Sequence, residues 1–101
     1  IKKVKEMKTK LKTIDNELYL EYVNSQGELI QNKVLKGWES WSGWYWFATE
    51  LNCYGEDGYH FGYVQGSYPE WGYFTEGELN SIKLVWPIKD IDLPHAGRRN
   101  D

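Results

Sequence analysis

Two stretches near the middle of the chain decide the fold: residues 44–50, which read WYWFATE, and residues 59–65, which read YHFGYVQ. Successive side chains of a strand point to opposite faces of a sheet. In the first stretch the two faces hold Trp44, Trp46 and Ala48 on one side and Tyr45, Phe47 and Thr49 on the other. In the second stretch, Gly62 predicts a bulge or a bulky neighbour, for instance a tryptophan of the preceding strand, lying across it.

The flanking sequence extends this pair of strands in both directions. On the N-terminal side, residues 14–23 alternate like a strand, residues 24–27 are turn formers, and residues 28–35 predict a partner strand of a hairpin. On the C-terminal side, Thr75 and Glu78 have the spacing of a capping box, and Phe74 and Leu79 have that of the accompanying hydrophobic staple. This cap predicts a short helix over about residues 75–83. The helix must end before Pro87, because proline cannot continue a helix.

Strands followed by a helix are typical of an α+β fold. We therefore predict a mainly antiparallel sheet of four to five strands with one short helix, about 75–83, packed on one face. The predicted organisation is a flexible basic leader at residues 1–13, a single domain at residues 14–94, and a loose polar tail at residues 95–101.

Length and composition are those of one globular domain. At 101 residues the chain is too short for two independent cores, and its 41% of hydrophobic residues exceeds what a disordered chain holds. No stretch approaches the roughly 20 apolar residues that span a bilayer. Cys53 is the only cysteine, so no intramolecular disulfide can form, and a reducing cytoplasmic location is the simplest interpretation.

Charge is distributed unevenly along the chain. Six of the 12 basic residues are lysines between residues 2 and 12, where Glu6 is the only acid. Residues 13–101 carry six basic and 14 acidic residues, a net charge of −8. An acidic body repels a phosphate backbone, which argues against nucleic acid as its partner. The lysine-rich leader can still contact an anionic partner, although charge runs at chain ends are usually solvated.

Three motifs occur in a fixed order: residues 44–50, then FGYVQG at residues 61–66, then PEWGYFTEGEL at residues 69–79. This series resembles a family of small bacterial proteins, a domain of unknown function that is common on plasmids, phages and integrated elements. The match covers roughly residues 40–82, without a counterpart for the predicted hairpin of residues 14–36. The family usually has one residue fewer between the strand aromatics and the Glu, and an Arg-Asp pair where this chain has Lys89-Asp90. The resemblance implies a fold and a mobile-element origin, and it implies no activity.

Few residues are suited to catalysis. The chain has no GxSxG, P-loop, GxGxxG, HExxH or CxxC motif. Cys53 with His60 or His95 is a conceivable pair of nucleophile and base. A zinc site needs three or four ligands, and the chain has only one cysteine and two histidines. We therefore predict no metal and no cofactor. Among the carboxylates, Glu50 and Glu70 could act as an acid and base pair if they converged in one cleft. Otherwise they accept hydrogen bonds from backbone N–H groups at turns or pair with Lys83 or Lys89. Asp57, in a predicted loop, is a further exposed carboxylate.

The aromatic content is the one unusual feature of the composition. Phe, Trp and Tyr make up 17% of the residues, and six of them are Trp. A domain of this size cannot bury all six, so we expect some to form a binding surface. Trp38, Trp41 and Trp71, in predicted turns, are the expected anchors. The full set of candidate binding residues is Trp38, Trp41, Trp44, Trp46, Glu50, Tyr63, Glu70, Trp71 and Tyr73.

Three functions fit this pattern. The first is a non-enzymatic interaction protein from a phage, plasmid or integrated element, which binds a host or element-encoded protein. The second is a domain that binds a nucleotide or sugar in a pocket of Trp44, Trp46, Tyr63 and Tyr73. The third is a hydrolase built on Glu50 and Glu70, which requires their carboxylates to share one cleft. The oligomeric state stays open, and unpaired sheet edges make a homodimer one of the alternatives.

Overall fold

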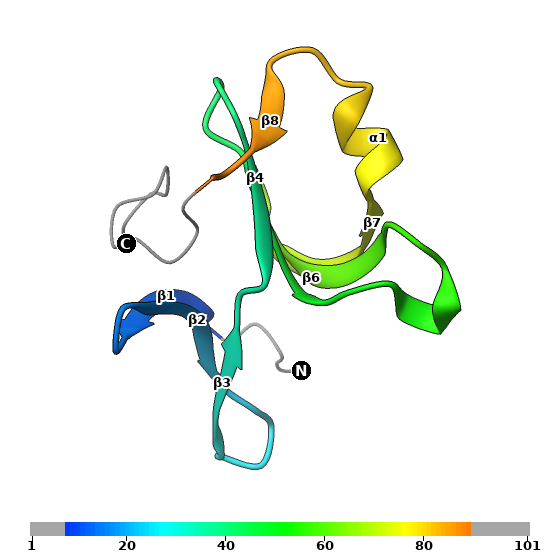
Figure 1. The fold of residues 1–101 in the computed structure, drawn as a ribbon. Helices are drawn as coiled ribbons and strands as arrows, with labels where there is room; N and C mark the ends of the chain where they lie inside the picture. The colour runs from blue at the N-terminus through cyan, green and yellow to red at the C-terminus, as the bar shows by residue number, and fades with distance from the viewer. Residues whose placement is uncertain (1–7, 90–101) are drawn as a thin grey trace.

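The structure is a computed structural model that describes residues 8–89 (Figure 1). Within these residues the chain forms eight strands and one α-helix, in the order β1 (Lys10–Ile14), β2 (Glu17–Val23), β3 (Leu29–Lys33), β4 (Lys36–Ser40), β5 (Tyr45–Glu50), β6 (Tyr59–Gln65), β7 (Glu70–Thr75), α1 (Glu76–Asn80) and β8 (Val85–Pro87). A 3₁₀ turn, Cys53–Gly55, lies between β5 and β6. The predicted dominance of antiparallel sheet with a short helix is confirmed. No helix among residues 8–89 has the length and apolar character that crossing a bilayer requires.

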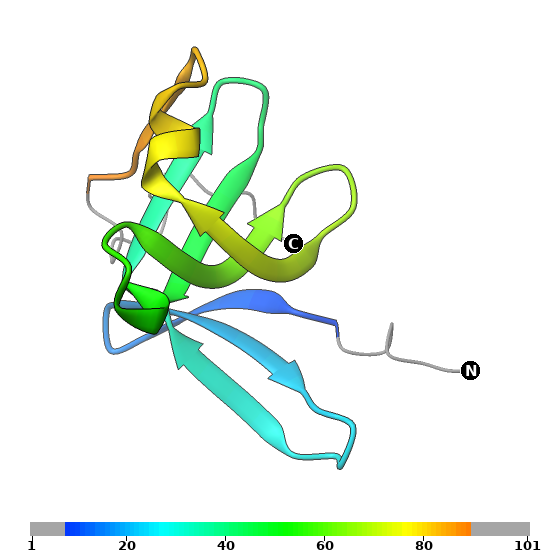
Figure 2. The ribbon, with the colours of Figure 1, turned by 90° about the vertical axis from the view of Figure 1, so that its right-hand side faces the viewer.

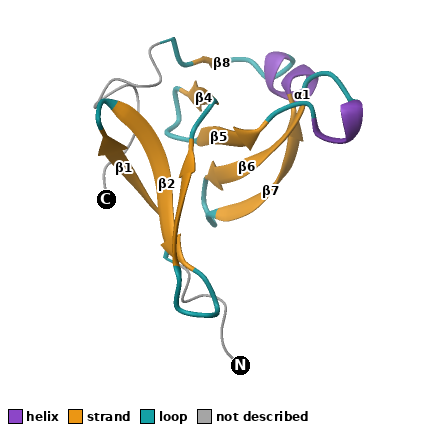
Figure 3. Ribbon diagram, turned by 60° about the horizontal axis from the view of Figure 1, so that its bottom comes forward, coloured by secondary structure: helices purple, strands orange, loops and turns teal. Residues whose placement is uncertain are grey.

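The strands form two sheets instead of the single sheet that we predicted. One sheet has the order β1-β2-β3, the other has the order β7-β6-β5-β4-β8, and all neighbouring strands are antiparallel. The three-stranded sheet lies across one side of the five-stranded sheet, and α1 lies on the side away from it (Figures 2 and 3). The larger sheet has five strands, within the predicted four to five, and the three-stranded sheet is additional to that prediction.

The chain passes from one sheet to the other at Val34 and Leu35. The Val34 N–H donates to the Leu18 carbonyl of β2 at 2.9 Å, whereas the Leu35 N–H donates to the Ala48 carbonyl of β5 at 2.8 Å. Two consecutive residues thus bond to different sheets, which is how strands make the corner of a crossed sheet packing. The predicted strand over residues 28–35 is therefore too long: β3 ends at Lys33, and Val34 and Leu35 connect it to β4 in the other sheet.

The folded region begins earlier than predicted. β1 pairs with β2 along its whole length, so residues 10–13 belong to a sheet and not to the flexible leader of residues 1–13. The connection between the two strands has positive φ at both central residues, Asp15 (51°) and Asn16 (67°), as in the two-residue turns of tight hairpins. Predictions for residues 1–7 and for the tail at 95–101 lie outside the described residues.

Apolar side chains pack on both faces of the five-stranded sheet. Between the two sheets, the first core cluster consists of Leu18, Leu20, Val34, Phe47 and Tyr63. On the opposite face, the second core cluster consists of Trp38, Ala48, Phe74 and Leu79. The division of β5 follows the predicted alternation, since Phe47 is in the first cluster and Ala48 is in the second.

The helix cap is confirmed in detail. The Thr75 hydroxyl accepts the Glu78 N–H at 3.0 Å, and the Glu78 carboxylate accepts the Thr75 N–H at 3.1 Å. Phe74 and Leu79 are buried in the same cluster, as the staple requires. The helix ends at Asn80, three residues before the predicted limit, because the chain turns back to pair β8 with β4 and Leu84 takes a positive φ of 63°.

Gly62 is crossed by backbone and not by a tryptophan. The register between β5 and β6 shifts between Ala48 and Glu50, and there the β5 chain lies so close that a Cβ on Gly62 would be 1.9 Å from the Phe47 carbonyl oxygen. The predicted tryptophan neighbour lies four residues further on, where a Cβ on Gly66 would be 2.4 Å from the Trp44 ring. The predicted irregularity at Gly62 is therefore present as a register shift, whereas the tryptophan suggested as its neighbour lies against Gly66.

Candidate functional site

The expected anchor Trp38 lies in the core. It is on β4, only 3% of its surface is exposed, and its ring stacks on His60 and meets Phe74 edge-on. The prediction that Trp38 lies in a turn and binds a partner is therefore wrong. The neighbours Gly37 and Glu39 suggested a turn at Trp38, but Trp38 pairs with Trp46 between β4 and β5.

Trp71 is half-buried and lies on β7 instead of in a turn. Its ring packs against the first core cluster and meets Tyr22 edge-on at 5.4 Å. The indole N–H donates to the Thr9 hydroxyl at 3.2 Å. Both the ring of Trp71 and its indole N–H therefore make contacts within the protein, which leaves less of the side chain for a partner.

Trp41 is the one predicted anchor that is strongly exposed, at 71% of its surface. It occupies the tip of the hairpin between β4 and β5, and its backbone N–H donates to the Leu84 carbonyl at 3.1 Å. This bond joins the hairpin tip to the segment that follows α1. Trp41 thereby becomes part of a continuous apolar surface, here called the tryptophan surface, which consists of Trp41, Trp44, Trp46, Ile82 and Leu84.

Local hydrogen bonds hold the tryptophan surface in place. The Ser40 hydroxyl accepts the Trp44 N–H at 3.1 Å and bonds to the Ser42 hydroxyl at 2.9 Å. The Trp44 ring covers Gly66 and lies 5.9 Å from the ring of Trp46. Between the hairpin and the segment after α1 the surface forms a groove of about 280 Å³. A second hollow of about 420 Å³, lined by Trp46 and Ile82 among others, continues it toward α1.

The predicted ligand pocket of Trp44, Trp46, Tyr63 and Tyr73 does not form. Trp46 pairs with Val64 and packs on the second core cluster, whereas Tyr63 belongs to the first cluster on the other face. Tyr73 pairs with Phe61 and shares the face of Tyr63. The two tryptophans and the two tyrosines are thus separated by the sheet itself.

Tyr73 is instead part of a second aromatic surface, here called the tyrosine face, which consists of Tyr54, Tyr59, Phe61 and Tyr73. The Tyr59 and Tyr73 rings stack at 5.1 Å, the Phe61 ring meets Tyr73 edge-on at 4.9 Å, and Tyr54 lies 5.9 Å from Tyr73. The hydroxyls of Tyr54 and Tyr73 are 3.1 Å apart. This bond, together with burial, raises the pKa of Tyr73 to about 12, so the phenol is protonated at neutral pH.

Glu50 and Glu70 do not converge. Their register partners on β6, Phe61 and Val64, are three residues apart and point to opposite faces. The two glutamates also lie on either side of β6, so their Cα atoms are about 14 Å apart by strand geometry. A glycosidase pair needs carboxylates within about 10 Å in one cleft, and this arrangement excludes that role for Glu50 and Glu70.

His60 is buried and fully bonded. Its Nδ1 accepts the Asn52 N–H at 3.2 Å, so the proton lies on Nε2, which donates to Glu76 at 2.7 Å. Glu76 also accepts from the Lys36 ammonium at 2.9 Å. These two donors, His60 first, lower the pKa of Glu76 below the usual carboxyl range. Cys53 donates to the Glu50 carbonyl at 3.8 Å, so no Cys53–His60 pair forms.

The lowered pKa of Glu76 predicts a stability change in acid. A carboxylate whose pKa is depressed by folding contributes stability above its unfolded pKa, and this contribution disappears as the pH falls through its folded pKa. Glu76→Gln should therefore lower the free energy of unfolding by about 1 kcal/mol at pH 7 and by almost nothing near about pH 3. Urea denaturation at several pH values measures the difference, with exposed Glu56→Gln as the control. An equal effect of Glu76→Gln at both ends of the range would contradict the assignment.

Sequence reasoning missed several members of both surfaces. Tyr59 and Phe61 alternate with Tyr63 in a predicted strand, so their common face could have been identified. Tyr54, Ile82 and Leu84 carry no such signal, because only the packing of loops against strands brings them to these surfaces. The chain matches no known protein-family profile, no curated protein and no solved structure.

Proposed function

We propose that this chain is a non-enzymatic, cytoplasmic interaction protein of a phage, plasmid or integrated element, and that it binds a host or element-encoded protein through the tryptophan surface. The observation that carries the proposal is the exposure of Trp41 beside Trp44, Ile82 and Leu84. Large contiguous apolar patches are rare on domains that bind nothing, and Trp is the residue most enriched at binding hot spots. The mobile-element origin comes from the motif resemblance alone.

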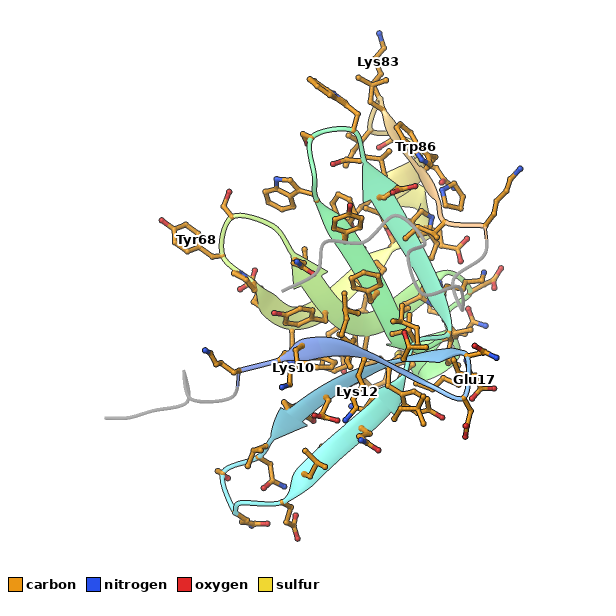
Figure 4. All side chains as sticks on the ribbon, turned by 90° about the vertical axis from the view of Figure 1, so that its left-hand side faces the viewer. Lys10, Lys12, Glu17, Tyr68, Lys83 and Trp86 are labelled. Carbon is orange, nitrogen blue, oxygen red and sulfur yellow. The ribbon has the colours of Figure 1, made fainter. Side chains whose placement is uncertain are left out.

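The groove suits an apolar side chain of a protein better than a polar small molecule. Sites for small molecules combine an apolar wall with several polar groups that fix the orientation of the ligand. Here the two serine hydroxyls at the hairpin bond to each other, and that of Ser40 also holds the Trp44 N–H. Lys83 is the remaining charged residue that lines the groove, and Figure 4 shows it projecting away from the ribbon.

The rigidity of the hairpin favours binding as well. Ser40, Ser42 and the Trp41–Leu84 bond restrain the loop before any partner arrives. A restrained surface loses less conformational entropy on association, so more of the energy of burying Trp41 contributes to affinity.

The proposal predicts that Trp41→Ala weakens partner binding by about 30-fold or more, the effect of losing one hot spot of about 2 kcal/mol. The partner would be captured from a lysate of the source organism with the tagged chain, identified, purified and titrated by calorimetry against the variants. Tyr68→Ala is the matched control, because Tyr68 is 86% exposed and extends from the β6–β7 loop (Figure 4). Both variants should unfold in urea at nearly the wild-type midpoint. A partner that binds wild type, Trp41→Ala and Tyr68→Ala with equal affinity would refute the role of this surface.

A further inference from the structure

The tyrosine face is a second, independent surface on the opposite side of the five-stranded sheet from the tryptophan surface. We propose that it binds a basic segment of a protein, with an arginine side chain stacked on Tyr54 and Tyr73 and paired with the acidic residues beside them. The inference does not rest on the tryptophan surface, and either surface could fail its test while the other passes.

The first support is the exposure of the rings. Tyr54 is 83% exposed, Tyr73 is 46% exposed, and neither residue belongs to the first core cluster. Cross-strand aromatic pairing explains the contact between Phe61 and Tyr73, which are register partners. It does not explain Tyr54, which belongs to a loop and nevertheless contacts both Tyr59 and Tyr73.

The second support is the loop that carries Tyr54. Tyr54 has a φ of 58°, an unfavourable conformation for a residue with a large side chain. Four bonds hold the loop in this shape: Gly55 N–H to Asn52 carbonyl, Glu56 N–H to Cys53 carbonyl, Tyr59 N–H to Glu56 carbonyl, and Gly58 N–H to the Asn52 side chain. The ring is therefore held in place before a ligand arrives, which reduces the entropy lost on binding.

The third support is the charge of this part of the chain. Residues 37–82, which include the whole tyrosine face, contain seven acidic residues and no lysine or arginine. Glu56 and Asp57 follow Tyr54 in the same loop, are exposed, and form no ion pair among residues 8–89. Glu50 is likewise exposed and pairs in register with Phe61 of the face. Exposed aromatic rings with exposed carboxylates in the same loop are complementary to a cation.

Chemistry then selects the kind of cation. An arginine guanidinium is planar, so it can stack on a tyrosine ring while its N–H groups bond to a carboxylate. Nucleotides and nucleic acids are disfavoured, because their phosphates would meet Glu56 and Asp57. A neutral sugar could also stack on the rings, but it would gain nothing from the absence of basic residues over residues 37–82.

The probe is a short soluble peptide of alternating glycine and arginine, compared with the same peptide carrying citrulline, which has the shape of arginine without the charge. Titration of the full isotope-labelled chain by NMR should show the arginine peptide binding at least about tenfold tighter, with shifts centred on Tyr54, Tyr59 and Tyr73. Tyr54→Ala should weaken that binding by about fivefold or more, and Glu56→Gln with Asp57→Asn should weaken it and reduce its salt dependence. Tyr68→Ala should leave it unchanged.

Four results would overturn the inference. These are equal binding or no binding of the two peptides, undiminished binding by Tyr54→Ala, shifts located away from the tyrosine face, and preferential binding of a neutral oligosaccharide such as cellohexaose. Tyr54 is exposed, so the fold should tolerate its loss, and the urea midpoint of the variant checks this directly.

Discussion

Gly62→Ala is expected to destabilise the protein by at least about 3 kcal/mol, and in a domain of marginal stability it should leave most of the chain unfolded. The added methyl group would lie 1.9 Å from the Phe47 carbonyl oxygen and 2.8 Å from the Ala48 Cα. Both atoms belong to the backbone of β5, which is paired on both sides inside the five-stranded sheet. Unlike a side chain, this backbone cannot rotate away, so β5 and β6 must separate. Urea denaturation followed by tryptophan fluorescence measures the loss.

The chain provides a matched control for this substitution. Gly72 is the direct register partner of Gly62 on β7, yet a Cβ added there meets nothing within 4 Å. Gly72→Ala should change the free energy of unfolding by no more than about 0.5 kcal/mol, the range of ordinary surface substitutions. Equal stabilities of Gly62→Ala and Gly72→Ala would mean that β5 does not cross Gly62 as closely as the structure shows.

Phe47→Ala is the second substitution with a large expected effect, a loss of about 3–5 kcal/mol. Phe47 is fully buried on β5 and lies in the first core cluster with Leu18, Leu20 and Tyr63. The two leucines come from β2 of the three-stranded sheet, so the Phe47 ring is a principal contact between the sheets. Its removal leaves a cavity where they meet, and we expect a large fall in the urea midpoint with a lower unfolding cooperativity.

Phe47→Leu is the control for the loss of the ring. It keeps most of the apolar volume and should cost less than about 1.5 kcal/mol. A cost of Phe47→Ala no greater than that of Phe47→Leu would show that the cavity closes and that the sheets are joined mainly elsewhere. Hydrogen exchange of β2 amides in both variants would identify which sheet opens first.

Some of this structure follows from local sequence. The strands at Tyr45–Glu50 and Tyr59–Gln65 were predicted from alternation, since a period of two depends only on where successive side chains point. The helix start was predicted for a similar reason, because a capping box is completed within four residues.

The candidate sites needed more than local pattern. Trp38 and Trp41 are three residues apart and chemically identical, yet one is buried against His60 and the other is the most exposed tryptophan described. Their difference arises because Trp38 packs in the second core cluster, against His60 and Phe74, whereas Trp41 lies at the tip of the β4–β5 hairpin. Nothing within a few residues of either tryptophan encodes this.

The sequence by itself determined the central strands, the capped helix and the acidic, aromatic character of residues 37–82. The tertiary structure alone decided the division into two sheets at Val34 and Leu35, the close crossing at Gly62, and which aromatic rings reach the surface. The physical reason is the range of the interactions. Alternation and capping act between residues a few positions apart, whereas burial depends on segments distant in sequence, such as β8 on β4 and the Tyr54 loop on β7.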